Sequence, residues 1–105
     1  VPLMQNTVRV AAAAVDARPG ELDANLDKIA AWTRTAVGQG AQLVLFQELS
    51  LCGFVPNHPS GNHDRWLREA LQLAWRWSQP LNGPAVQRLI RIAAEHRVLI
   101  AAGLL

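Results

Sequence analysis

The sequence predicts a single α/β domain in which helices pack on a sheet. The first observation is the length of 105 residues, which suffices for one domain with a modest core. The second is that half of the residues are apolar, as in globular proteins. The third is the order of the segments: strand, helix, strand, loop, two helices and strand. Alternation of this kind is typical of helices layered on a sheet.

The first half of the chain predicts a strand, a helix and a second strand. Thr7–Val15 is rich in Val and Ala and apolar on both alternating faces, like a strand buried on both sides. A turn cluster over residues 16–20 ends it. From Leu22 to Val37, apolar residues recur at spacings of three and four with charged residues between them, which indicates an amphipathic helix. Ala41–Phe46 is again typical of a buried strand.

The second half predicts a loop, two helices and a third strand. Residues 53–64 hold two Gly, two Pro and two Asn, which indicates a loop. Apolar residues return at helical spacing over His63–Ser78. A third helix is expected to open at Pro84, because proline is favoured at the first helical position. Val98–Ala102 then reads as the third strand.

The last residues, Gly103-Leu104-Leu105, follow this strand without a closing helix or a polar tail. Natural domains usually avoid an unpaired apolar edge of this kind. We therefore expect residues 1–105 to be the N-terminal portion of one longer domain, truncated after the third strand. We also expect the piece alone to be poorly soluble or to self-associate.

The composition argues against several classes of protein. The formal net charge is +2 at pH 7, but the arginines are scattered and form no basic stripe, so we expect no nucleic-acid partner. No apolar run approaches the ~20 residues of a membrane-spanning helix, and the first residues do not resemble a secretory signal. The single cysteine, Cys52, excludes an internal disulfide. These features predict a cytoplasmic protein with no membrane partner.

Glu48 is the leading candidate for chemistry because it follows four apolar residues, at the expected C-terminal end of a strand. Ligand crevices in open α/β sheets form outside these strand ends. A carboxylate in such a crevice can serve as a general base. The alternative is a glutamate that points into water or caps a neighbouring helix, and position alone favours this alternative.

The sequence around Glu48 runs GAQLVLFQELSLCGF over residues 40–54. It resembles the glutamate motif of the nitrilase superfamily of carbon–nitrogen hydrolases. In that motif a Gly-Ala and an apolar strand lead to Phe-Pro-Glu, and a Gly and an aromatic residue follow. Residues 8–12, 18–26 and 81–103 resemble the segments that flank the motif in the family. The similarity thus spans nearly the whole chain.

Two positions depart from the family pattern. Gln47 stands where the family usually has proline, and Ala14 stands where its first strand commonly has glutamine. Because proline fixes φ and glutamine does not, we expect the backbone that aims Glu48 to be looser here.

The resemblance implies an α-β-β-α sandwich, of which this chain supplies the N-terminal part, and a homo-oligomer of such sandwiches. It implies hydrolysis of a non-peptide carbon–nitrogen bond in a small amide, N-carbamoyl compound or nitrile, with no metal and no organic cofactor. In the family, three residues act in the chain order Glu, Lys and Cys. The cysteine thiolate attacks the carbon, the lysine stabilises the developing negative charge, and the glutamate takes the thiol proton and later activates water.

Only Glu48 matches this set, as the catalytic glutamate. The single lysine, Lys28, precedes it on the polar side of the first helix, and we expect it to face solvent. Cys52 lies within the motif, whereas the family nucleophile comes much later, so we expect Cys52 to be a small, semi-buried filler. The catalytic Lys and Cys would then lie beyond Leu105, and the 105-residue piece alone is predicted to be inactive.

Position alone suggests Phe54 and Asn57 as substrate-pocket residues. His58, His63 and Asp64 cluster in the loop, but no third ligand has a suitable spacing, so we predict no metal site. The tryptophans of the second helix are expected to pack in the core or against another subunit.

Two other functions remain open. A non-catalytic truncated paralogue would act, if at all, by binding a partner through its exposed sheet edge. The presence of a Lys and a Cys further along the chain would distinguish the enzyme from this binding protein. A nucleotide-binding α/β domain needs a Gly-rich turn after the first strand, and the single glycine in residues 16–20 argues against it.

Overall fold

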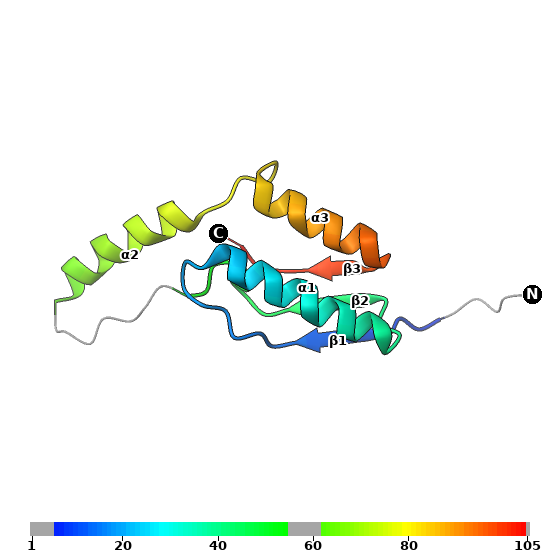
Figure 1. Ribbon diagram of the computed structural model, residues 1–105. Helices are drawn as coiled ribbons and strands as arrows, with labels where there is room; N and C mark the ends of the chain where they lie inside the picture. The colour runs from blue at the N-terminus through cyan, green and yellow to red at the C-terminus, as the bar shows by residue number, and fades with distance from the viewer. Residues whose placement is uncertain (1–5, 55–61, 105) are drawn as a thin grey trace, which may run out of the picture.

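The computed structural model describes residues 6–54 and 62–104 (Figure 1). Within these ranges the elements occur in the predicted order. They are β1 (Val10–Ala13), α1 (Leu22–Gly38), β2 (Leu43–Phe46), α2 (His63–Trp77), α3 (Pro84–His96) and β3 (Leu99–Ala101). All three strands are shorter than predicted, whereas the helix boundaries agree to within one residue. In this part of the chain, no helix combines the length and apolar character needed to span a membrane.

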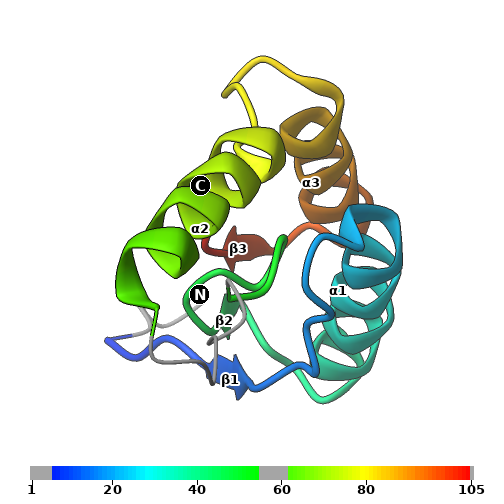
Figure 2. The same ribbon diagram turned by 90° about the vertical axis from the view of Figure 1, so that its left-hand side faces the viewer.

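The three strands form one parallel sheet in the order β1-β2-β3. Val10 pairs with Leu43, and Leu43 pairs with Leu99 on its other side. Parallel neighbours require a crossover connection, which α1 supplies between β1 and β2. Figure 2 shows α1 and α3 on the same side of the sheet. The predicted α/β class is confirmed, with two helices layered on one face.

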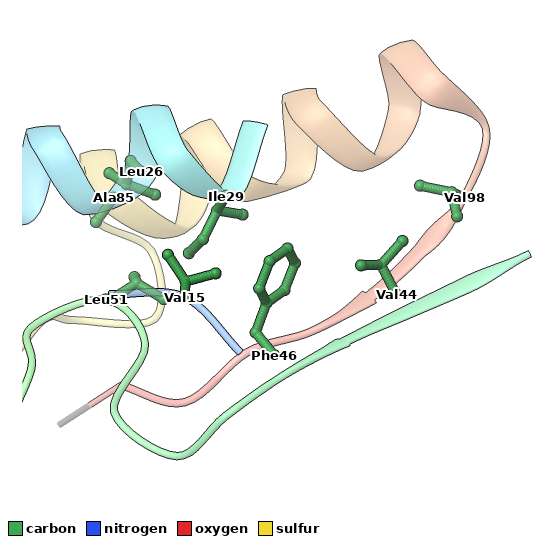
Figure 3. Close-up of a cluster of buried hydrophobic side chains, with 8 residues drawn as sticks. All are labelled: Val15, Leu26, Ile29, Val44, Phe46, Leu51, Ala85 and Val98. Atoms are coloured by element: carbon green, nitrogen blue, oxygen red, sulfur yellow. The ribbon is translucent and has the colours of Figure 1, made fainter. Parts of the chain in front are cut away.

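The core lies between the sheet and these two helices (Figure 3). Ile29 of α1 and Val44 of β2 are fully buried, and Phe46 is 4% exposed. Burial of side chains of this size contributes about 1.5–3 kcal/mol each. The cluster also contains Leu26 of α1, Ala85 of α3, and three residues of the connecting segments (Val15, Leu51 and Val98). The apolar stripe that the sequence predicts for α1 is therefore the face of the helix that packs on the sheet.

The opposite face of the sheet is open within the described residues. Side chains alternate along each strand, so those paired across this face belong to Val10, Leu43 and Leu99, and to Ala12, Leu45 and Ala101. Of these, Val10 is 50% exposed, Leu45 46% and Leu99 69%. The expectation of strands covered on both sides is met on one face only. All six residues are apolar, whereas a solvated sheet face normally carries polar residues.

Helix α2 lies beyond the carboxyl ends of the strands (Figure 1). The Asn62 side chain caps it by accepting a hydrogen bond from the Arg65 N–H at 3.0 Å. None of its residues is buried, and Trp75 is 85% exposed. Trp75 therefore does not pack in the core of this chain, and the alternative, packing against another subunit, stays a prediction. Trp77 does reach the rest of the domain, because its indole lies against Gly20.

Candidate functional site

Glu48 lies where the sequence predicts it, just past the C-terminal end of β2. It begins a turn that spans residues 48–52, and it is exposed to solvent. All three strands are parallel, so their carboxyl ends share this edge of the sheet. The edge is where ligands bind in open α/β sheets, and an exposed carboxylate there is accessible to a substrate.

Leu49 has an unusual backbone conformation directly after Glu48. Its φ is +53°, in the left-handed region that non-glycine residues rarely adopt. The N–H of Gly53 donates to the carbonyl of Leu49 at 2.8 Å and closes the turn. A left-handed leucine costs about 1–2 kcal/mol, so it persists only where its surroundings hold it. The turn that carries Glu48 is therefore held in one shape by its neighbours.

Gly103, which follows β3, supports one side of this turn. Its N–H donates to the Ser50 hydroxyl at 3.2 Å, and its carbonyl accepts from the Leu51 N–H at 3.2 Å. A Cβ at Gly103 would lie 2.5 Å from the Leu49 nitrogen and 3.2 Å from the Glu48 Cα. Only glycine allows the two backbones to approach this closely.

Asn25 of α1 supports the other side of the turn. Its side chain is fully buried, and Nδ2 donates to the carbonyls of Leu51 at 2.8 Å and Arg18 at 2.9 Å. Its Oδ1 accepts from the Arg18 N–H at 2.8 Å. The Gly20 N–H adds a bond of 2.7 Å to the Cys52 carbonyl. The segment after β1 and the turn after β2 are thus fastened together through one asparagine.

The structural role of Asn25 did not emerge from the sequence pattern. A signal was available, because Asn25 falls among Leu22, Leu26 and Ile29 on the apolar stripe of the helix. An amide on a buried stripe must find hydrogen-bond partners inside the protein. Ser50 and Gly103 gave no comparable signal, since each acts through a contact between distant parts of the chain.

Gln47, the residue before Glu48, is held by its side chain. Its Oε1 accepts from the Val15 N–H at 3.0 Å, and its Nε2 donates to the Val15 carbonyl. We expected glutamine in place of proline to leave this backbone looser. The structure contradicts this expectation, because the two hydrogen bonds tie residue 47 to the segment that follows β1.

Lys28 and Cys52 are both engaged in the fold. The Lys28 ammonium donates to the Asp16 carbonyl and lies 3.9 Å from the Asp16 carboxylate. Its side chain is 31% exposed, so it faces solvent in part, as expected, while its ammonium is held by Asp16. Cys52 is 2% exposed and its Sγ donates to the Gly53 carbonyl at 3.2 Å. A buried thiol suits the expected filler more than a nucleophile, which needs access to substrate.

The structure describes only some of the remaining candidate residues. Phe54 is described and 59% exposed, whereas Asn57 and His58 lie outside the described residues. His63 is exposed at the start of α2 and its ring lies 5.6 Å from that of Trp66. Among the residues that the structure describes, no group of three or more His, Cys, Asp or Glu could hold a metal ion.

Comparison with protein families tests whether the resemblance around Glu48 holds for the rest of the chain. Residues 9–105 match the carbon-nitrogen hydrolase family, a range that holds all six elements, the turn and its supports. The chain belongs to the carbon–nitrogen hydrolase family. The resemblance to the nitrilase superfamily is thereby confirmed, and membership implies chemistry at a carbon–nitrogen bond. A comparison with curated proteins gave no match.

Proposed function

We propose that this hydrolase acts on a small amide, N-carbamoyl compound or nitrile and that Glu48 is its general base. One observation carries the proposal. In a chain of this family, the glutamate at the carboxyl edge of the sheet sits in a turn that Gly103 supports from one side and Asn25 from the other. A base must be fixed relative to the proton that it takes, and this support provides that geometry.

The proposed reaction has two halves. A cysteine thiol gives its proton to Glu48, and the resulting sulfur attacks the substrate carbon to form a tetrahedral intermediate. For an amide, Glu48 returns this proton to the nitrogen, the carbon–nitrogen bond breaks, the amine leaves, and a thioester remains. Glu48 then takes a proton from water, whose oxygen attacks the thioester carbon and releases the acid and the thiol. A lysine stabilises the oxyanion of each intermediate.

We propose that the cysteine and the lysine come from residues outside these 105. Lys28 is bound to Asp16 and Cys52 is buried, and the sequence contains no other lysine or cysteine. In the same proposal, residues 1–105 are the N-terminal portion of one domain. The open sheet face supports this, because a second sheet packed on its apolar residues would complete an α-β-β-α sandwich.

A binding function is the second candidate. The same apolar face, with Leu99 69% exposed, could receive another chain without any catalysis. A 105-residue protein that lacks a second catalytic residue would act in this way only. The decisive difference is whether the natural polypeptide carries a lysine and a cysteine that complete the set with Glu48.

The test uses the full-length protein from its natural gene and measures ammonia release from carboxamides, N-carbamoyl amino acids and nitriles. Glu48→Gln keeps the shape of the side chain but removes the base, so we expect the rate to fall about 10²- to 10⁴-fold. Glu95→Gln, an exposed change on α3, is the matched control and should leave the rate unchanged. A wild-type protein that hydrolyses none of these compounds, or an E48Q variant as fast as wild type, would refute the proposal.

A further inference from the structure

We infer that Gln47 is a positioning residue for Glu48, and that its side chain does by hydrogen bonding what a proline ring does by covalent constraint. The inference rests on the proposed function of Glu48. It concerns how the Glu48 carboxylate is oriented. Gln47 would act through Glu48 and would not itself touch the reacting atoms.

The position of Gln47 in the sheet explains how its side chain reaches Val15. The last paired residues of β1 and β2 are Ala13 and Phe46, so Ala14 and Gln47 are the next residues along the two strands. Beyond this point the backbone ladder stops. The Gln47 amide takes its place, with one acceptor for the Val15 N–H and one donor for the Val15 carbonyl. The side chain thus copies the hydrogen bonds of a strand residue.

We call the two hydrogen bonds between the Gln47 side chain and the Val15 backbone the Gln47 clamp. Val15 is well placed to hold it, because it is part of the core. It is 7% exposed and belongs to the buried core with Leu26 and Phe46. Gln47 itself is half-buried, so water competes only partly for its two bonds. Each such bond contributes about 0.5–1.5 kcal/mol. Residue 47 is therefore tied through its side chain to a residue of the buried core.

The Gln47 clamp holds the side of Glu48 that the other hydrogen bonds of the turn do not reach. The hydrogen bonds from Gly103, Asn25 and Gly20 all reach residues 50–52, on the far side of Glu48. The Gln47 side chain holds the residue directly before it. With both flanks fixed, the Cα–Cβ bond of Glu48 has one direction, which limits where the carboxylate can lie. Without the clamp, glutamine leaves φ at residue 47 free, as proline would not.

The two departures from the family pattern also meet at this point. Ala14 and Gln47 are neighbours in the register, and Val15, which the amide binds, is next to Ala14. The glutamine that the first strand commonly supplies is absent, while a glutamine appears on the adjacent strand where proline is usual.

The test compares Gln47→Ala and Gln47→Pro in the full-length enzyme, with kcat and KM measured on the best substrate of the wild type. An ångström-scale shift of a catalytic group can cost about 10²-fold, so we expect kcat of Q47A to fall about 10- to 100-fold with KM nearly unchanged. Q47P, which restores the constraint on φ, should recover most of the lost kcat. Gln87→Ala, an exposed change on α3, is the control and should match wild type.

The outcomes separate the inference from the proposed function. A wild-type enzyme without activity refutes both. An active wild type with an equally active Q47A refutes only the inference, as does a loss of kcat that disappears when rates are divided by the folded fraction from circular dichroism. If Q47A does not fold, Gln47→Glu replaces it, since the carboxylate keeps the acceptor and loses the donor. An intermediate kcat supports the clamp, and a wild-type kcat overturns it.

Discussion

At Gly103 the backbone after β3 touches the peptide that joins Glu48 to Leu49, and no space is left for a side chain. Gln47, Glu48 and Leu49 are consecutive, and each is constrained differently: by a side-chain clamp, by its place between fixed neighbours, and by a left-handed backbone. Single residues around the turn therefore set the aim of the carboxylate. Substitutions at this scale should affect catalysis even when they do not touch the substrate.

Gly103→Ala should destabilise the full-length protein by about 1–3 kcal/mol, because its new methyl group would overlap backbone atoms that cannot move aside. The displaced turn should also lower kcat. Urea unfolding together with steady-state kinetics checks both effects. Gly38→Ala is the control, since a Cβ there meets nothing within 4 Å. Equal stability and activity for the two variants would contradict this account of Gly103.

At the scale of the elements, α1 does more than cover the sheet. It contributes Ile29 to the core and Asn25 to the turn after β2, so one helix carries both the packing and the support of the site. Helix α2 differs, since it buries no residue. The structure thus combines a well-packed sheet layer with a helix that its own chain leaves largely uncovered.

Asn25→Ala should cost the full-length protein about 2 kcal/mol or more, because it leaves the Leu51 and Arg18 carbonyls and the Arg18 N–H without their buried partner. Differential scanning calorimetry should show a clearly lower Tm. Asn62→Ala, which removes only the cap of α2, should shift the Tm much less, since α2 contributes little to the core. A larger Tm shift for Asn62→Ala than for Asn25→Ala would contradict the view that α1 supports the core and the turn while α2 contributes little.

Periodicity and turn residues predicted all six elements, their order and the place of Glu48, because these depend on local sequence. The contacts that hold the site could not be predicted in this way. Gln47 meets Val15 across 32 residues and Gly103 meets Ser50 across 53, and neither distance leaves a periodic signal. The surroundings of α2 could not be predicted either, because an apolar stripe shows only that a helix has a face to cover. It does not show what covers it.

Over the whole molecule, apolar surface is distributed unevenly. One face of the sheet is packed under α1 and α3, while the other exposes Val10, Leu45 and Leu99. The parallel strands leave this face without the polar residues of a solvated surface. Covering this face would therefore be favourable for the 105-residue chain.

The 105-residue chain alone should self-associate through this face. Leu99→Lys should weaken the association, because a charge on the contacting face would have to be buried. Leu81→Lys, at a residue that is 78% exposed but lies outside the sheet, should not. Sedimentation velocity over a range of concentrations provides the measurement. A wild-type chain that stays monomeric and unfolds in one sharp transition would show the prediction to be wrong.

The hydrogen bonds of Gly103 also set an order of events during synthesis. Residue 103 emerges from the ribosome 53 residues after Ser50, whose hydroxyl it binds. Contacts between residues so far apart must wait for the chain between them, here including α2 and α3, to be made and folded. We therefore expect the hydrogen bonds of Gln47 and Asn25, whose partners precede residue 52, to hold the turn around Glu48 first. The support from Gly103 can form only when β3 joins the sheet, so this side of the turn should be completed last.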